Sequence, residues 1–470
     1  MHLSHSFGRR PIILFVCLSG GLGYYVGYLN GTHPEWPASQ WPAPTPDKVL
    51  VPTTVTLREP QATVTVTTEA FSPRAELRPV LNGTPTAAFK DNLRPDVQYV
   101  TAWPASGFTN DFMGYMNLIY LGLLTERVPI IPSFTPSHVT HFDTNGPRLD
   151  FGAVFDIPRL ERELGKPVLE WSQVKDQNSV VMDQLGCWNI WEAVSVDRTP
   201  RAYPPPVLKI DASYTVAPKW VKLLPNDEDD PHIKLSALVS LAFPGKRESN
   251  LQSPVQSPVL EVLLEPDHHL LCFDHLYWVV TLEQHEMFRD YSPSWRFVGQ
   301  YIHWVPRIEG LAHTYLRQAF ALAPAESIPQ YIAIHVRHGD FAAMCDGVPE
   351  LDCFAPLIAY ARRVEEVRAE ILKMKGIAIE RVVMTSDEQD PAWWDAVRAL
   401  GWAYPDHTNT VQQYGKWYPI LVDGAIQSGS LGFVGTDEST VSMVASRRIK
   451  SWRGGAARMV KWGKLGADDH

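Results

Sequence analysis

Helical and strand-like segments alternate along the second half of this 470-residue chain, and the alternation constrains its fold more than any other feature. Apolar, β-branched runs at residues 331–336, 381–385 and 431–434 predict buried strands. Helices are predicted before, between and after them, at residues 308–322, 354–373, 392–400 and 417–427 and from Ser439 onward. Strands joined by helices in this way form a parallel sheet, so an α/β fold is predicted.

The first half shows the same pattern once. A run from Val97 to Trp103 is followed by a small-residue turn, a periodic apolar segment at 110–125 and a short strand at 128–131. This is a βαβ unit. Although residues 133–300 are less regular, we expect two Rossmann-like domains, 95–300 and 301–470. Two such domains facing each other form a cleft of the kind that binds nucleotides.

An uncharged apolar run of nineteen residues, Pro11 to Leu29, lies near the N-terminus. At about 1.5 Å per residue it spans roughly 28 Å, close to the hydrocarbon thickness of a bilayer. Arg9 and Arg10 precede it, so residues 1–10 are expected in the cytosol and the remainder in the lumen. A cleaved signal peptide would give the same compartment, but no small-residue cleavage site follows the run. We favour a single-pass type II anchor.

Residues 30–94 are predicted to be an extended stem. Ten prolines between Pro34 and Pro85 disfavour helices and central strands there. Two N-glycosylation sequons, at Asn30 and Asn82, follow the apolar run. Both suit a lumenal segment, so the predicted location is the membrane of the Golgi or the endoplasmic reticulum, with the folded head in the lumen.

Four of the five cysteines lie after the apolar run, in a compartment where disulfides form. No CxxC pair exists, which argues against zinc. Cys345 and Cys353 are close enough in sequence to close a small loop, and we expect them to pair. Cys187 and Cys272 either pair with each other, by elimination, or remain buried thiols.

The strongest chemical motif follows the strand at 331–336. A net charge of −10 argues against a nucleic-acid partner and leaves any anionic ligand to locally placed arginines. Arg337 emerges where Gly339 ends the strand, and open α/β sheets bind ligands at the carboxyl ends of their strands. Its planar, permanently charged fork suits a diphosphate. The other interpretation, an ion pair with Asp340 at a domain surface, stays open.

Two further strand ends carry polar residues. Thr436, Ser439 and Thr440 lie between a strand and a helix, where backbone N–H groups and hydroxyls form an anion site. Ser439 also suits the N-cap of that helix, and the two roles are compatible. Asp387 follows the strand at 381–385, where a carboxylate can accept a hydrogen bond from a base or a ribose.

Together these motifs resemble the GDP-fucose protein O-fucosyltransferase family over about residues 97–450. The family's H-x-R-x-G-D motif, its acidic strand end, its V-D-x-A-I…V-G-T…S-T element and its glycine–asparagine turn are matched by residues 335–340, 385–388, 422–440 and 107–110. The resemblance implies a GT-B fold of two facing Rossmann-like domains. It also implies inverting, metal-independent transfer of fucose from GDP-fucose to a protein or glycan hydroxyl, without a cofactor.

The resemblance assigns roles to single residues as well. Arg337 would neutralise the β-phosphate of the departing GDP. His335 would contact the nucleotide and Asp387 would accept from guanine. The remaining donor-binding residues would be Gly107, Asn110, Asp340, Asp423, Thr436, Ser439 and Thr440.

The general base is not fixed by the resemblance. Many family members carry arginine or glutamine after the amino-terminal asparagine, whereas Asp111 follows here, and Ser106 stands where some members have a catalytic glutamate. Asp111 is therefore the candidate base. Two other functions stay open: transfer from another nucleotide sugar, and non-catalytic binding of a nucleotide sugar or glycan on the same fold.

A group of histidines and aspartates between residues 267 and 275 is reminiscent of a metal cluster. Alternation along a strand places His269 and His275 on one face, and His268 and Asp274 on the other. Because the ligands are split in this way, no metal site is predicted.

Overall fold

The computed structural model describes residues 79–134, 139 and 148–469. The expected cytosolic tail, the apolar run at 11–29 and the sequon at Asn30 lie outside these ranges. Within them, no helix is both long enough and apolar enough to cross a bilayer.

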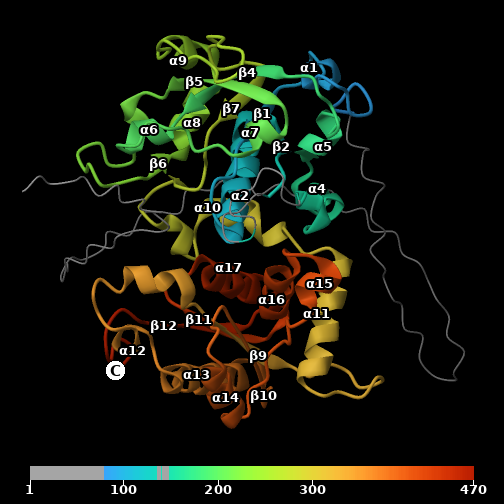
Figure 1. Ribbon diagram of the computed structural model, residues 1–470, viewed down its shortest axis with the longest axis vertical. Coiled ribbons are helices and arrows are strands. Elements are labelled where there is room, and N and C mark those ends of the chain that lie inside the picture. The colour runs from blue at the N-terminus through green and yellow to red at the C-terminus, as the bar shows by residue number, and fades with distance from the viewer. Residues whose placement is uncertain (1–78, 135–138, 140–147, 470) are drawn as a thin grey trace, which may run out of the picture. The chain divides into compact units, whose positions relative to one another are not determined.

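The N-terminal half is built on a parallel sheet with the strand order β3-β2-β1-β7-β4-β5 (Figure 1). Helix α2 joins β1 to the neighbouring β2, which confirms the predicted βαβ unit. The strands are β1 Tyr99–Ala102, β2 Val128–Ile131, β3 Leu169–Glu170, β4 Asp183–Asn189, β5 Ile210–Val216 and β7 Leu270–Phe273, and a separate pair is formed by β6 Ile233–Lys234 and β8 Val279–Val280. The helices are α1 Phe89–Asn92, α2 Phe108–Thr125, α4 Ile157–Leu164, α5 Trp171–Val174, α6 Trp191–Val194, α7 Pro204–Val207, α8 Leu235–Leu241, α9 Pro244–Glu248 and α10 Pro293–Phe297.

The C-terminal half contains a second parallel sheet, in the order β10-β9-β11-β12. Three of its strands were predicted; β12 was not, because its sequence interrupts the apolar run with Arg458. The strands are β9 Tyr331–Val336, β10 Arg381–Ser386, β11 Gly432–Thr436 and β12 Ala456–Val460. The helices are α11 Pro306–Ala319, α12 Glu350–Cys353, α13 Leu357–Lys375, α14 Pro391–Ala399, α15 Thr410–Tyr414, α16 Tyr418–Gly429 and α17 Thr440–Arg448.

The two faces of the second sheet are covered by different helices, α13 on one face and α16 on the other (Figure 1). Ile332 and Ile334 of β9 pack in the same core cluster as Val367 of α13, whereas Ala333 shares a cluster with Leu421 of α16. This division follows from the two-residue period of a strand. It also directs position 335 toward the face covered by α16 and α17.

The packed part of the chain begins earlier than predicted. Phe89 and Leu93 are buried in the core of the N-terminal half, and the Asn92 amide donates to the carbonyls of Gln173 and Val174. The compact unit therefore begins at Pro79 and not at residue 95, so the predicted end of the stem is wrong. Asn82 is exposed, and its amide donates to the carbonyls of Asp91 and Leu93.

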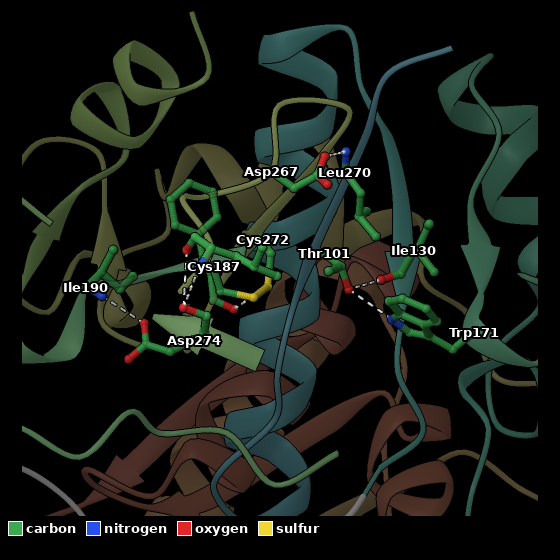
Figure 2. Close-up of a disulfide and its surroundings, with 12 residues drawn as sticks. Thr101, Ile130, Trp171, Cys187, Ile190, Asp267, Leu270, Cys272 and Asp274 are labelled. Carbon is green, nitrogen blue, oxygen red and sulfur yellow. Dashed lines mark hydrogen bonds between the residues drawn. A yellow bond between two sulfur atoms is a disulfide. The ribbon is translucent and has the colours of Figure 1, made fainter. Parts of the chain in front are cut away.

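Both cysteine pairs are disulfides. Cys345–Cys353 confirms the predicted small loop, and Cys187 and Cys272 also pair with each other. Cys187 lies on β4 and Cys272 on β7, which are neighbouring strands, so this bridge joins strands inside the first sheet (Figure 2).

Candidate functional site

Three parallel strands of the second sheet end side by side and bring the predicted residues together. Val336 of β9 pairs with Ser386 of β10, and His335 pairs with Gly435 of β11. The residues that follow these strand ends therefore meet at one edge of the sheet. Arg337 and Asp387 come from this edge, where doubly wound sheets place their ligands.

Arg337 lies between two carboxylates. Its Nη2 is 2.5 Å from Asp340 Oδ1, and its Nη1 is 2.8 Å from Asp387 Oδ2. Its backbone N–H donates to Thr436 Oγ1 at 3.0 Å. The ion pair with Asp340 considered from the sequence is thus present, yet 22% of the arginine side chain stays exposed at the strand end. The guanidinium is both oriented by carboxylates and accessible to a ligand.

Asp387 approaches the backbone of the loop closely. Its Oδ1 accepts from the His338 N–H at 2.8 Å, while the His338 ring contacts Glu388 Oε2 at 2.7 Å. Gly339 has a φ of +26°, and a Cβ there would lie 2.3 Å from Asp387 Oδ2. Only glycine fits between this carboxylate and the turn.

His335 is buried beneath the edge and does not lie on its surface. Only 7% of it is exposed, and its Nδ1 is 2.8 Å from the hydroxyl of Ser442 on α17. Burial, with a smaller contribution from Arg337, lowers the pKa of His335 to about 3. The ring is therefore neutral and supports the turn between β11 and α17, where Ser442 Oγ also accepts from the Thr436 N–H.

The β11–α17 turn carries three hydroxyls, of which those of Thr436 and Ser439 are buried and that of Thr440 is partly exposed. Thr436 Oγ1 contacts the Tyr360 hydroxyl at 2.9 Å in addition to accepting from Arg337, so Thr436 organises the site from below. Ser439 is the N-cap of α17, as predicted, and accepts from the Ser442 N–H at 3.5 Å. Thr440 Oγ1 donates to Asn110 Oδ1 at 2.8 Å.

This Thr440–Asn110 contact brings the beginnings of two helices together across 330 residues of sequence. Asn110 lies in the first turn of α2, whose N-cap is Gly107, and Thr440 is the first residue of α17. The partial positive charge at a helix N-terminus favours anions. Both helix starts therefore face the junction between the halves.

Asp111 is as deeply buried as Thr436. It is 2% exposed, and its Oδ1 accepts from the N–H groups of Ala105 and Ser106 at 3.1 and 3.0 Å. Burial raises the pKa of Asp111 well above its usual value, and the two hydrogen bonds offset only part of this effect. Its Oδ2 is buried without a partner in the described part of the chain.

Asp423 does not join this network. It lies on α16, where its Oδ1 accepts from His407 Nε2 at 2.8 Å. The two aspartates of the 267–275 segment also have other partners. Asp267 accepts from the Leu270 N–H and Asp274 from the Ile190 N–H, as Figure 2 shows. Asp267 thus holds the backbone at the start of β7, and Asp274 holds the backbone just after β4.

Several contributors were not identified from the sequence. Ser442 contacts both His335 of β9 and Thr436 of β11, Tyr360 contacts Thr436, and Glu388 orients His338. Ser442 could have been found, because the third residue after an N-cap faces back toward the cap. Tyr360 gives no such signal, since it reaches Thr436 only through the packing of α13.

No protein-family model matches the chain, and no curated protein matches it in sequence. Among solved structures, it is similar to POFUT1 in complex with GDP-fucose, at 13% identity and a TM-score of 0.46 over 77% of this chain and 98% of that one. It is also similar to NodZ alpha-1,6-fucosyltransferase soaked with GDP-fucose, at 13% identity and a TM-score of 0.36 over 75% and 93%. A third similar structure, fucosyltransferase NodZ from Bradyrhizobium, has 13% identity and a TM-score of 0.37 over 74% of this chain and 91% of that one. At these similarities the function has to be argued from the chain's own residues.

Proposed function

We propose that this chain is an inverting, metal-independent glycosyltransferase of GT-B type that moves fucose from GDP-fucose to a hydroxyl of a protein or glycan. The observation that carries the proposal is the accessible guanidinium of Arg337 at the strand-end edge of the second sheet. The identity of the donor, GDP-fucose, is inferred from the resemblance of the sequence motifs. We further propose that an N-terminal type II anchor places the head in the lumen of the Golgi or the endoplasmic reticulum.

The geometry of Arg337 suits a leaving diphosphate. A guanidinium has five N–H donors, and the contacts with Asp340 and Asp387 occupy one on each Nη. The remaining donors are left for phosphate oxygens while the two carboxylates hold the fork in place. GDP gains negative charge only as its bond to fucose breaks, so Arg337 stabilises the transition state more than the bound donor.

The other proposed roles surround this residue. Thr440, Ser439 and Asn110 present two helix starts to the phosphates and sugar. Asp387 accepts from guanine with lone pairs that its contacts leave available, and Asp111 takes the proton of the acceptor hydroxyl. His335 and Thr436 lie beneath the surface of the site and contribute by holding the residues after β9 and β11 in place.

The test is a panel of nucleotide sugars measured by calorimetry and by GDP release with the full chain. We expect GDP-fucose to bind and to be turned over. Arg337→Ala should lose about 10²–10³-fold in turnover, the usual cost of one such donor. Arg337→Lys should recover little, because an ammonium cannot reproduce the fork.

A matched control is Arg458→Ala. Arg458 lies on β12 of the same sheet and also contacts two carboxylates, those of Glu366 and Glu370, but not at the strand ends. Its replacement should leave turnover unchanged. Near-normal turnover in Arg337→Ala would contradict the mechanism. Binding of GDP-fucose without any turnover would instead favour a non-catalytic nucleotide-sugar-binding protein, which the deep burial of Asp111 makes the second candidate.

A further inference from the structure

A small cavity lies at the carboxyl edge of the first sheet. Its volume is about 10 Å³, and Asn110, Asp111 and His275 are among the residues that line it. A space of this size accommodates a single water-sized oxygen but no sugar or phosphate.

Three of the lining side chains carry buried polar atoms without a hydrogen-bond partner among the described residues. These atoms are Trp103 Nε1, Asp111 Oδ2 and His275 Nε2, and the three residues are 2%, 2% and 4% exposed. The last two are an acid–base pair. Leaving a buried polar group unpaired costs about 1–3 kcal/mol. An oxygen bearing hydrogens can donate to a carboxylate and contact an imidazole at the same time, so a single water has the chemistry to serve both Asp111 and His275.

The cavity adjoins the junction where the donor is proposed to bind. His275 follows β7 by two residues, and β7 pairs with β1, which leads into the turn before α2. Asn110 lines the cavity and also accepts the hydrogen bond from Thr440 of α17. The cavity is thus separated by a single side chain, that of Asn110, from the start of α17, where the phosphates are proposed to bind.

We propose that this cavity holds one water molecule between Asp111 and His275, and that the water relays the proton of the acceptor hydroxyl to Asp111. This inference rests on the proposed function. The acceptor oxygen forms a bond to the anomeric carbon of fucose, and the bond from that carbon to the β-phosphate oxygen breaks with its electrons leaving on GDP. The hydroxyl proton passes to the water, and a water proton passes to Asp111 Oδ2. His275 is a positioning residue that orients the water.

The experiment measures GDP-fucose binding by calorimetry and GDP release with water as the acceptor, using the full chain. Asp111→Asn should keep the donor affinity and lose about 10²-fold or more in kcat, the usual range for general-base catalysis. His275→Leu should lose kcat, whereas His275→Gln, which keeps a hydrogen-bonding group, should retain more of it. Formate should restore part of the turnover of Asp111→Gly, a response that a purely structural role does not predict.

Asp211→Asn serves as the matched control. Asp211 lies on β5 of the same sheet and is equally buried, but both of its oxygens accept hydrogen bonds, from Val259 and Leu260 among others. This variant should lower the melting temperature and leave kcat unchanged. If wild type binds GDP-fucose but Asp111→Asn turns over normally, or if wild type binds it and releases no GDP, the relay is overturned. If wild type does not bind GDP-fucose, the proposed function itself fails.

Discussion

The contact between Arg337 and Asp387 depends on Gly339, which lies in the loop after β9 and against the Asp387 carboxylate. Asp387 Oδ2 is 2.8 Å from Arg337 Nη1, and the same oxygen would lie 2.3 Å from a Cβ at position 339. A glycine is therefore required for steric reasons as well as for its φ of +26°. This close approach sets the direction of the guanidinium.

Gly339→Ala should displace Asp387 and turn the arginine fork. We expect a loss of stability of about 1–2 kcal/mol from the left-handed backbone alone, and a weaker affinity for GDP-fucose in addition. Melting temperature and calorimetry measure the two effects separately. Gly401→Ala is the control, because Gly401 has a φ of +75° with no atom near its missing Cβ. An equal affinity in both variants would show that Asp387 does not orient Arg337.

At the residue scale, the sequence predicted which side chains follow strand ends but not how deep they lie. Arg337 and Asp387 each follow a strand, as predicted, and they meet because parallel strands end at a common edge. His335 belongs to the same motif, yet strand alternation turns it inward to Ser442. The pairing of Asn110 with Thr440 could not be predicted, because it depends on how the halves pack.

At the element scale, the two disulfides close loops of very different length. Cys345 and Cys353 are 8 residues apart and close the segment after the Arg337 loop, whereas Cys187 and Cys272 are 85 residues apart. A crosslink stabilises mainly by restricting the unfolded chain, and more so for a longer loop. The longer bridge should therefore contribute more to stability.

Cys187→Ala/Cys272→Ala should lower the free energy of unfolding by about 4.5 kcal/mol, and Cys345→Ala/Cys353→Ala by about 2.5 kcal/mol, in the loop-entropy description. Denaturant unfolding of both double variants compares the two values. Only the second variant should also weaken GDP-fucose binding, because only its loop adjoins Arg337. A larger loss of stability from the shorter loop would contradict this account.

Long, strongly periodic elements were the predictable ones. The predicted strand at 331–336 coincides with β9, and the helix predicted at 354–373 corresponds to α13, Leu357–Lys375. The middle of the chain was harder to predict because many of its elements are short, although β4 and β5 have seven residues each. Strands β3, β6 and β8 each have two residues, too few to show a period.

At the scale of the whole molecule, one apolar core cluster extends through both halves of the described chain. Arg448 of α17 is buried within it, and its guanidinium carbon lies 4.4 Å from the ring centroid of Trp304 and 4.9 Å from that of Phe112 on α2. Burial lowers the pKa of Arg448 to about 9, so it remains a cation at neutral pH. Its contacts with aromatic rings from both halves join them.

Buried histidines make the stability of this molecule depend on pH. Burial lowers the pKa of His275 and His335 to about 3 and that of His303 to about 4. Unfolding returns each to an ordinary value near 6.5, so the unfolded chain binds more protons between these limits. Each histidine therefore contributes stability that is present above about pH 6.5 and is lost as the pH falls toward 3. Burial raises the pKa of Asp274 to about 7, which acts in the opposite direction.

Because the contributions of the histidines and of Asp274 oppose each other, the pH dependence of the wild type shows only their sum. A variant that removes one histidine isolates its contribution. His335→Gln should lower the number of protons taken up on unfolding by about one between pH 4 and 6. In this range the free energy of unfolding should therefore rise less steeply with pH than in wild type, by about 1.4 kcal/mol per pH unit. The measurement is the free energy of unfolding in denaturant at several pH values, with the slopes compared and not the absolute stabilities, since the lost hydrogen bond to Ser442 lowers the whole curve. His313→Gln, at an exposed position of α11, is the control and should run parallel to wild type. Parallel curves for His335→Gln and wild type would mean that His335 is not held neutral in the folded chain.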